Sequence, residues 1–389
     1  MEVSVRVNFD KLIGNNKWAM YCVALMVGLA MGVINPLATT HMTRNNVGEI
    51  WIGAISSSYF FFMALGSIFI YKKQRGKDIR KLLILGLVLT AACAIGFPLV
   101  NNKVLWFILM SLMGAGISFN MVGIQTAMQN VTDSNNKALV SGIYSFCFAI
   151  GFIISSVVGP RLFENAPWLA FLMGSVGLCI AVVFINYRLK DLLTIPTYLE
   201  GKILSKITLA LFGAFAYGFS ETTLISLYPL FMSNLNFGLA QVGYALGTFV
   251  VGSLLGTLPI TYLADKIGRK KCLGLTIFFS LFSVMGVMIF DTFSSKLIFS
   301  FIAGFTIGPI YPLSLSLSVQ DLTQEEMLSG VALFTFAYGI GSTAGPFISS
   351  ISMKYLGNNY IFSFSFIIFV ILLIYIAVSS KCPKSKLLQ

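Results

Sequence analysis

Long apolar runs separated by short polar segments cover most of the chain of 389 residues. Twelve runs contain about 20 residues each, the length that an α-helix needs to cross the hydrocarbon core of a bilayer. The predicted spans are 18–38, 48–71, 82–100, 104–128, 138–160, 167–187, 205–232, 240–263, 272–291, 296–319, 329–351 and 360–380. The pattern therefore predicts an all-α membrane protein with twelve transmembrane helices.

The first six runs and the last six share short sequence patterns at a nearly constant spacing. The matches are Gly53 and Gly66 with Gly243 and Gly256 at 190 residues, Asn35-Pro36-Leu37 with Tyr228-Pro229-Leu230 at 193, and Ser141-Gly142 with Ser329-Gly330 at 188. Spacings near half of the chain length indicate an internal duplication. We therefore expect two pseudo-symmetric six-helix bundles, residues 1–187 and 205–389, joined by a cytoplasmic linker of residues 188–204.

The composition agrees with a membrane protein, since 57% of the residues are hydrophobic and only 10% are charged, against about 25% in soluble domains. If both termini are cytoplasmic, 21 of the 26 Lys and Arg residues lie on the cytoplasmic side. Basic residues resist transfer across the bilayer, so this orientation in the cell inner membrane is predicted. The net charge of +12 then faces anionic lipid headgroups and needs no nucleic-acid partner. The outer loops would hold His41, Arg44, Lys103, Arg161, Lys296 and Lys354.

One acid lies near the middle of a predicted span. Glu221 precedes Met232, the expected outer end of its helix, by eleven residues, which corresponds to a depth of about 16 Å. An acid is costly at this depth, so it tends to face a cavity or a partner. Glu221 is therefore the candidate proton carrier. The alternative is a protonated acid that donates a structural hydrogen bond to a neighbouring helix.

Polar and aromatic side chains within the spans are candidates for binding a substrate. They are Asn35, Asn120, Gln125, Tyr217, Tyr228, Tyr311 and Tyr338. Any one of them can instead serve helix packing through hydrogen bonds or ring contacts. The predicted spans hold no Lys or Arg at mid-depth, which argues against a strongly anionic substrate because such a substrate needs a fixed cation. A neutral, zwitterionic, cationic or lipophilic small molecule is expected, with no catalytic residue, metal site or cofactor.

A dense basic cluster follows the eighth span and contains one acid. It includes Asp265, Gly268 and Arg269, and its Lys and Arg residues place it on the cytoplasmic side. Asp265 follows an apolar helix, close to where neighbouring helices would present unpaired backbone N–H groups. It can therefore stabilise one arrangement of the helices over another, and we predict that these three residues control a conformational change.

The segment Ala264-Asp265-Lys266-Ile267-Gly268-Arg269-Lys270 resembles the loop signature G-x-L-A-D-R-x-G-R-K of the major facilitator superfamily, with Thr261 in place of the first glycine. Ser56-Ser57-Ser58-Tyr59-Phe60 and the stretch 341–346 are similar to its YcaD-type branch. This resemblance covers the whole chain. It implies the major facilitator fold, two six-helix bundles around a central cavity that opens alternately to each side under an ion gradient.

The resemblance also bears on individual residues. Glu221 is similar to an acid found in the seventh span of the branch. Gln125 stands where many members of the branch carry a glutamate in the fourth span, so a coupling scheme with two acids does not carry over to this chain.

These features favour a secondary active transporter that moves a small organic solute by alternating access, coupled to protons through Glu221, as a monomer surrounded by membrane lipids. Efflux is favoured over proton-coupled uptake of a neutral or zwitterionic nutrient. A membrane receptor that kept the fold and lost turnover is the alternative from another class. An enzyme is disfavoured because the spans contain no paired acids, no metal cluster and no Ser/His set.

Overall fold

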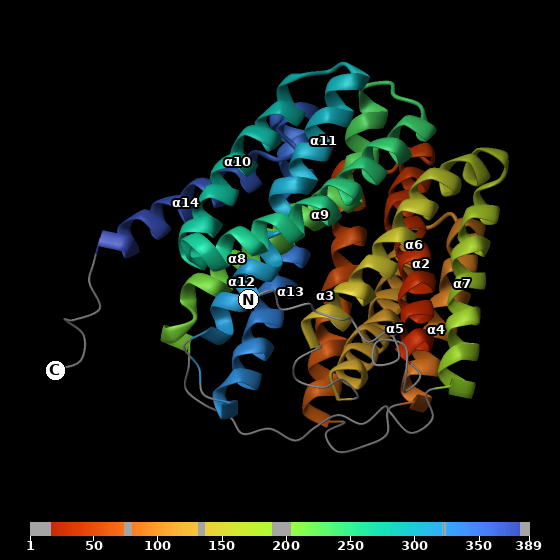
Figure 1. Ribbon diagram of the computed structural model, residues 1–389. Coiled ribbons are helices and arrows are strands. Elements are labelled where there is room, and N and C mark those ends of the chain that lie inside the picture. Colours follow the sequence, from red (N-terminus) through yellow and green to blue (C-terminus); the bar gives the residue numbers. More distant parts are fainter. Residues whose placement is uncertain are drawn as a thin grey trace.

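The computed structural model describes residues 17–73, 80–130, 137–188, 204–320, 322 and 324–381, and this part of the chain is almost entirely helical, without strands. The helices of the first half are α2 (Lys17–Arg44), α3 (Glu49–Lys73), α4 (Arg80–Gly96), α5 (Lys103–Asn130), α6 (Lys137–Asn165) and α7 (Pro167–Arg188). Those of the second half are α8 (Thr208–Asn234), α9 (Leu239–Ile267), α10 (Arg269–Ile289), α11 (Phe293–Ile307), α12 (Ile310–Gln320), α13 (Gln324–Leu356) and α14 (Ser363–Lys381). Because α11 and α12 form one broken span, each half has six membrane-spanning helices, as predicted (Figure 1).

Ten described segments are long and apolar enough to cross a bilayer, counting α11 and α12 as one. A helix suits this environment because it satisfies its own backbone polar groups where no water is present. The other two spans, α8 and α13, are diluted by glycine, serine and threonine. They pack against each other, and α8 is buried along most of its length. The two more polar helices therefore share the interior of the second half.

Helix contacts in the two halves repeat with a spacing of 190 residues. Gly28 of α2 faces the carbonyl oxygen of Phe148 in α6, and Gly218 of α8 faces that of Tyr338 in α13. Further contact pairs at this spacing are Gly151–Leu25 with Gly341–Phe215, Gly114–Tyr59 with Gly304–Phe249, and Gly66–Ala115 with Gly256–Phe305. The turns after α2 and α8 also correspond, since Asn46 and Asn236 have positive φ angles of 55° and 63°. The expected pseudo-symmetry of the two bundles is confirmed.

The spacing of 190 residues shows that two of the three sequence matches do not join equivalent positions. Pro36 corresponds to Ser226, and Thr39 corresponds to Pro229, so the two prolines are displaced from each other by about one helical turn. The Ser-Gly match is out of register by two residues. Only the glycine match between α3 and α9 reflects structural equivalence.

The repeat places a buried lysine where the first half has a tryptophan. Trp106 of α5 donates from Nε1 to the carbonyl oxygen of Phe97 at 3.0 Å, and Lys296 of α11 donates from Nζ to that of Val287 at 2.6 Å. Lys296 is fully buried and also pairs with Asp291 at 3.0 Å. Its assignment to an outer loop was wrong, because it belongs to the first turn of α11 and bonds the free carbonyl end of α10.

His41 also lies in a helix, which corrects its predicted place in a loop. It is buried in the last turn of α2, with the rings of Phe97, Trp106 and Phe163 at centroid distances of 5.7–6.1 Å. The helix continues past the predicted end at residue 38, and the hydroxyl groups of Thr40 and Thr43 each donate to the carbonyl oxygen one turn back. These polar residues therefore lie within the helix rather than beyond its end.

The two halves pack against each other along α3 with α13 and along α6 with α9. A Cβ atom on Gly53 of α3 would overlap the side chain of Ser350, and one on Gly243 of α9 would overlap the carbonyl oxygen of Ser156. Small residues allow such close approach of helix backbones. Both contacts lie toward the end where α2 passes to α3, at the top of Figure 1, which we call the upper end.

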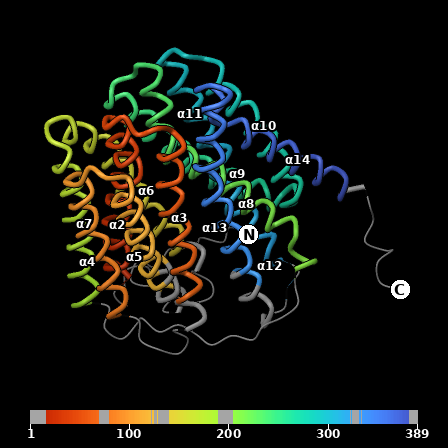
Figure 2. The backbone as a smooth tube through the Cα atoms, turned by 180° about the vertical axis from the view of Figure 1, so that it is seen from behind, coloured from red at the N-terminus to blue at the C-terminus, as the bar shows by residue number. Residues whose placement is uncertain are grey.

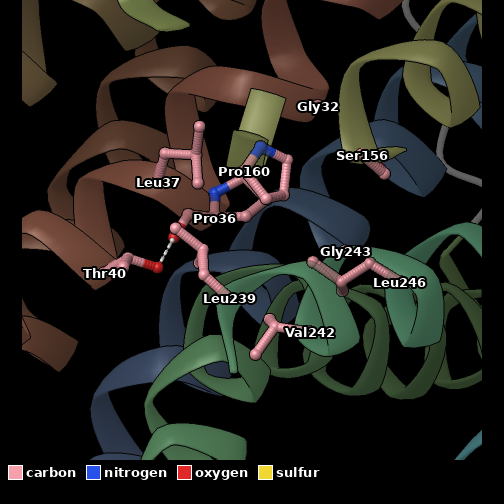
Figure 3. Close-up of a pocket in the computed structure, with 10 residues that line it drawn as sticks. All are labelled: Gly32, Pro36, Leu37, Thr40, Ser156, Pro160, Leu239, Val242, Gly243 and Leu246. Carbon is pink, nitrogen blue, oxygen red and sulfur yellow. Dashed lines mark hydrogen bonds between the residues drawn. The ribbon is translucent and has the colours of Figure 1, made fainter. Parts of the chain in front are cut away.

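Little space remains between the halves at this contact. A cavity of about 10 Å³ lies between α2, α6 and α9, enough for one water molecule (Figure 3). Its lining is mostly apolar and includes Pro36, Pro160, Leu239, Val242 and Leu246. Figure 2 shows the two halves side by side from behind, with α14 at the outer edge of the second half.

Candidate functional site

The carboxylate of Glu221 lies in the middle of α8 and accepts two hydrogen bonds. Tyr217, one turn earlier in the same helix, donates to Oε1 at 2.6 Å. Tyr338 of α13 donates to Oε2 at 2.9 Å. Because an ionised carboxylate only accepts and each phenol has one hydrogen to donate, both oxygens are satisfied without a basic side chain. The predicted proton carrier therefore links α8 to α13.

Tyr311 of α12 completes a group of three tyrosines at this acid. Its ring centroid lies 5.3 Å from that of Tyr217 and 5.6 Å from that of Tyr338. The rings of Tyr217 and Tyr338 stack on each other with their centroids 5.9 Å apart. Phe334, one turn before Tyr338, packs on Tyr311 at 5.2 Å. We call Glu221, Tyr217, Tyr311 and Tyr338 the Glu–Tyr cluster; the structure brings together these four of the predicted site residues.

Two backbone features bring the cluster together. A Cβ atom on Gly218 would lie 2.5 Å from the carbonyl oxygen of Tyr338, so glycine is required for α13 to lie this close to α8. The span of α11 and α12 breaks at Gly308 and Pro309, where proline has no N–H to continue the helix. Tyr311 consequently projects from the first turn of a new helix.

The cluster remains accessible although its surroundings are buried. All four of its side chains are partly exposed, whereas residues 218–220 and 222–224 of α8 are buried. The accessible positions 217, 221 and 225 recur at every fourth residue and so form one stripe along α8. Glu221 therefore lies on the face of α8 that keeps accessible surface.

The first half has no equivalent chemistry at the matching positions. Met31, Met121 and Phe148 occupy the positions that correspond to Glu221, Tyr311 and Tyr338 at a spacing of 190. These three side chains are also partly exposed. These three accessible positions recur in both halves, whereas Val27, which corresponds to Tyr217, is buried. The acid and these two phenols stand in the second half alone.

Two predicted amides lie buried in the first half. The side-chain nitrogen and oxygen atoms of Asn35 and Asn120 have no hydrogen-bond partner among the described residues, and the same holds for the hydroxyl group of Tyr59, which faces Asn35. Buried polar groups are normally bonded to protein or to water. These amides could bind a ligand or a water molecule, and their part in substrate binding stays a prediction. The side chain of Gln125 lies outside the described part of the structure.

Tyr228 takes part in helix packing. It is fully buried, its hydroxyl group lies 2.7 Å from Oγ of Ser300 in α11, and its ring stacks on Phe231 at 5.6 Å. The residues that it contacts lie outside the Glu–Tyr cluster. The role of Tyr228 in substrate binding stays a prediction. The contacts of Ser300 and Phe334 with these tyrosines were not predicted from the sequence. Phe334 could have been found, because it precedes Tyr338 by one helical turn and so shares its helix face.

Asp265, Gly268 and Arg269 lie where α9 passes to α10. Asp265 is exposed, and Gly268 has a φ angle of 95°, which favours glycine. Arg269 donates from Nη1 to the carbonyl oxygen of Ser316 in α12 at 3.1 Å. Together with Ala264 and Gln320 these residues border an open depression of about 390 Å³. The junction thus contacts the helix that carries Tyr311, and its control of a conformational change stays a prediction.

A family model described as Major Facilitator Superfamily matches residues 20–197 and again residues 210–387. The chain belongs to the major facilitator superfamily. Two consecutive matches agree with the duplication, whereas the expected linker 188–204 lies mostly outside the described residues and its bounds stay a prediction. Membership of this transporter family identifies the protein as a multi-pass membrane transporter rather than an enzyme.

Relatives support the YcaD-like branch. Proteins of Escherichia fergusonii and Salmonella enteritidis, each described as an uncharacterized MFS-type transporter YcaD, are both 24% identical to this chain. The first similarity covers 90% of this chain and 93% of the relative, and the second 91% and 94%.

Two solved structures share the fold at low sequence identity. A bacterial homologue of the human lysosomal transporter Spinster, inward-facing and occupied, is 11% identical with a TM-score of 0.73, covering 94% of this chain and 96% of the other. A point mutant of the nucleoside transporter NupG is 13% identical with a TM-score of 0.76, covering 93% and 99%. At these identities the similarity shows the fold alone.

Proposed function

We propose that this transporter moves a small organic solute by alternating access and couples that movement to protons at Glu221, in the direction of efflux. The observation that carries the proposal is the surroundings of Glu221. It is a partly exposed acid in the middle of a membrane helix, bonded by two phenols, with no ion pair to it among the described residues. Acids at such depth commonly belong to proton pathways.

Protonation would change the bonding of the cluster. An ionised Glu221 accepts from both Tyr217 and Tyr338, whereas a protonated carboxyl group has a hydrogen of its own to donate. One of the two phenols must then turn or become an acceptor. Because Tyr338 belongs to α13, the protonation state acts on the contact between α8 and α13 and can bias the arrangement of the helices.

Efflux follows from competition at one carboxylate. If a proton and the solute bind to Glu221 in turn, loading one releases the other, so the two move in opposite directions. An inward proton gradient then drives the solute outward. The excess of basic residues supports a cytoplasmic position for the lower end and both termini, in the cell inner membrane, so that the closed upper end faces outward.

The test uses purified protein in vesicles that enclose a pH-sensitive dye. Ligands found by thermal shift are added under a pH gradient, and each transported ligand should move protons. Glu221→Gln should abolish this proton movement while the protein stays folded and still exchanges ligand across the membrane. Glu164→Gln is the matched control, because Glu164 is an exposed acid near the upper end of α6 and its loss should leave proton movement unchanged.

If the Glu221→Gln protein still accumulates ligand fully under a pH gradient, Glu221 is not the residue that couples transport to protons. A ligand that binds saturably but does not cross the membrane under any gradient would instead indicate a receptor.

A further inference from the structure

The Glu–Tyr cluster combines a carboxylate with several aromatic rings. Three tyrosine centroids lie within 5.3–5.9 Å of one another, and two of the phenols bond the acid directly. The face of an aromatic ring attracts a cation within about 6 Å of its centroid, most strongly where water is excluded. A carboxylate beside such rings is the chemistry that recognises an organic cation.

All four residues of the cluster keep some accessible surface, and one of the rings is supported by a buried side chain. Tyr217, Tyr311 and Tyr338 keep part of their surface exposed, as does the acid, while Phe334 behind Tyr311 is fully buried. The ring of Tyr311 is therefore held in place from behind. Tyr217 and Glu221 lie together on the accessible stripe of α8.

Charge balance also favours a cation. The titratable groups of the described residues that face Glu221 are Tyr217 on its own helix, Tyr338 on α13 and Tyr311 on α12. The helices packed on α8 carry their described basic groups near their ends: Lys17, His41 and Arg44 in α2, Lys266 in α9, Lys296 in α11 and Lys354 in α13. A charge in the membrane interior needs a partner. With no basic side chain of the described residues facing it, the carboxylate is neutralised by a proton or by its ligand.

We propose that the Glu–Tyr cluster binds a lipophilic organic cation, of the ammonium or phosphonium class, which takes the place of the proton on Glu221. The inference rests on the proposed function and narrows its substrate. One proton is released for each monovalent cation that binds, so the net charge of the site stays the same. The phenols Tyr217 and Tyr338, which donate to the carboxylate, also offer their ring faces to the bound cation.

The test compares tetraphenylphosphonium with tetraphenylborate, which has the same shape and the opposite charge, on the full-length protein in lipid nanodiscs. Saturable binding is expected for the phosphonium ion alone. In the acid range where protons compete, its dissociation constant should rise about tenfold for each unit by which the pH falls, since one proton is displaced. In Glu221→Gln this pH dependence should vanish and the affinity should drop by about tenfold or more.

Substitutions of Tyr311 separate the contribution of the ring to cation binding from that of the hydroxyl group. The ring of Tyr311 contacts the other two rings, whereas the hydroxyl groups that donate to the acid are those of Tyr217 and Tyr338. Tyr311→Phe keeps the ring and should bind within about twofold of the parent, whereas Tyr311→Leu removes it and should bind about tenfold more weakly. Equal losses in the two variants would show that the ring face does not hold the cation. A folded Tyr311→Leu protein is verified by its melting temperature.

The outcomes also separate this inference from the proposed function. If the phosphonium ion does not bind saturably, or if the borate binds equally well, the ligand is not an organic cation. Proton movement driven by a neutral ligand would then still support the proposed function. Phosphonium binding that depends on pH, without proton movement in vesicles, upholds the cation site and overturns the coupled transport.

Discussion

Lys296 and Glu221 are both ionisable residues within helices, and their surroundings give them different roles. The Lys296 ammonium group is enclosed by the carbonyl oxygen of Val287, the carboxylate of Asp291 and the ring of Phe231, 4.5 Å from its centroid. It has no exposed surface. Glu221 keeps exposed surface and is bonded by phenols. An enclosed charge with fixed partners stabilises the fold, whereas an accessible one can exchange its proton.

Replacing Lys296 by methionine should destabilise the protein without acting on proton coupling. The substitution keeps most of the apolar stem but leaves the carbonyl oxygen of Val287 without its donor. Removing one partner of a buried hydrogen bond costs about 1–3 kcal/mol. The free energy of unfolding should fall by about that amount, and Lys354→Met, at an exposed lysine near the end of α13, is the control. Equal effects of the two substitutions would contradict a bracing role for Lys296.

Sequence reasoning found the acid but only part of its surroundings. Tyr217 carries a local signal, because residues four apart share a helix face. Tyr338 is 117 residues away from Glu221, so its bond depends on α8 lying against α13, which no local pattern shows. Lys296 stands at the boundary between a polar segment and an apolar run, where composition alone does not separate a loop lysine from a buried one.

Among the helices, α3 and α9 play equivalent parts in joining the halves. Gly53 contacts Pro346 and Ser350 of α13, and Gly243 contacts residues 156 and 160 of α6. At a spacing of 190 residues, positions 156 and 160 correspond to 346 and 350, so the two contacts are equivalent. The contacts are close and leave no room for a side chain. Alternating access requires that they separate in the other state of the transporter.

Large side chains at these two glycines should therefore open the upper end. Gly53→Trp or Gly243→Trp would overpack the closed state by about 1–3 kcal/mol, which shifts the equilibrium between states by about five- to 150-fold. Nitroxide labels on Asn101 and Ser294, both exposed near the upper end, should report longer distances, and transport should slow accordingly. The effects of the two single substitutions should be alike because the contacts are equivalent.

Gly48→Trp is the control for this pair, since a Cβ atom there meets nothing within 4 Å. Unchanged label distances in both tryptophan variants would show that the upper contacts are not a moving part of the protein.

The arrangement of the elements was predictable where an apolar run sets a helix, and the prediction failed where polar residues continue one. Each of the twelve apolar runs corresponds to a described span. The end of α2 was placed too early because the helix runs on through Thr39, Thr40 and His41, where the apolar run has ended. The proline match misled because prolines mark bends, which need not fall at equivalent positions in two diverged halves.

At the scale of the whole molecule, a symmetric scaffold carries asymmetric chemistry. The contact pairs at a spacing of 190 residues hold the helices of both halves in one geometry. Met31 and Phe148 nevertheless stand where the second half has Glu221 and Tyr338. Fold symmetry could be read from the glycine spacing, whereas the location of the acid in one half had to be found residue by residue.

If accessibility and a phenol donor are what a proton carrier needs, the first half can be made to carry it. In a Glu221→Gln background, Met31→Glu together with Phe148→Tyr should restore part of the proton-coupled transport, measured in the dye-filled vesicles. Met31→Glu alone should restore less, because an acid in the membrane interior without a hydrogen-bond donor costs about 1–3 kcal/mol. Phe148→Tyr alone, which adds no acid, should restore none. Failure of the double variant to move protons, with the protein still folded, would mean that the coupling depends on the second half through more than the acid and its phenol.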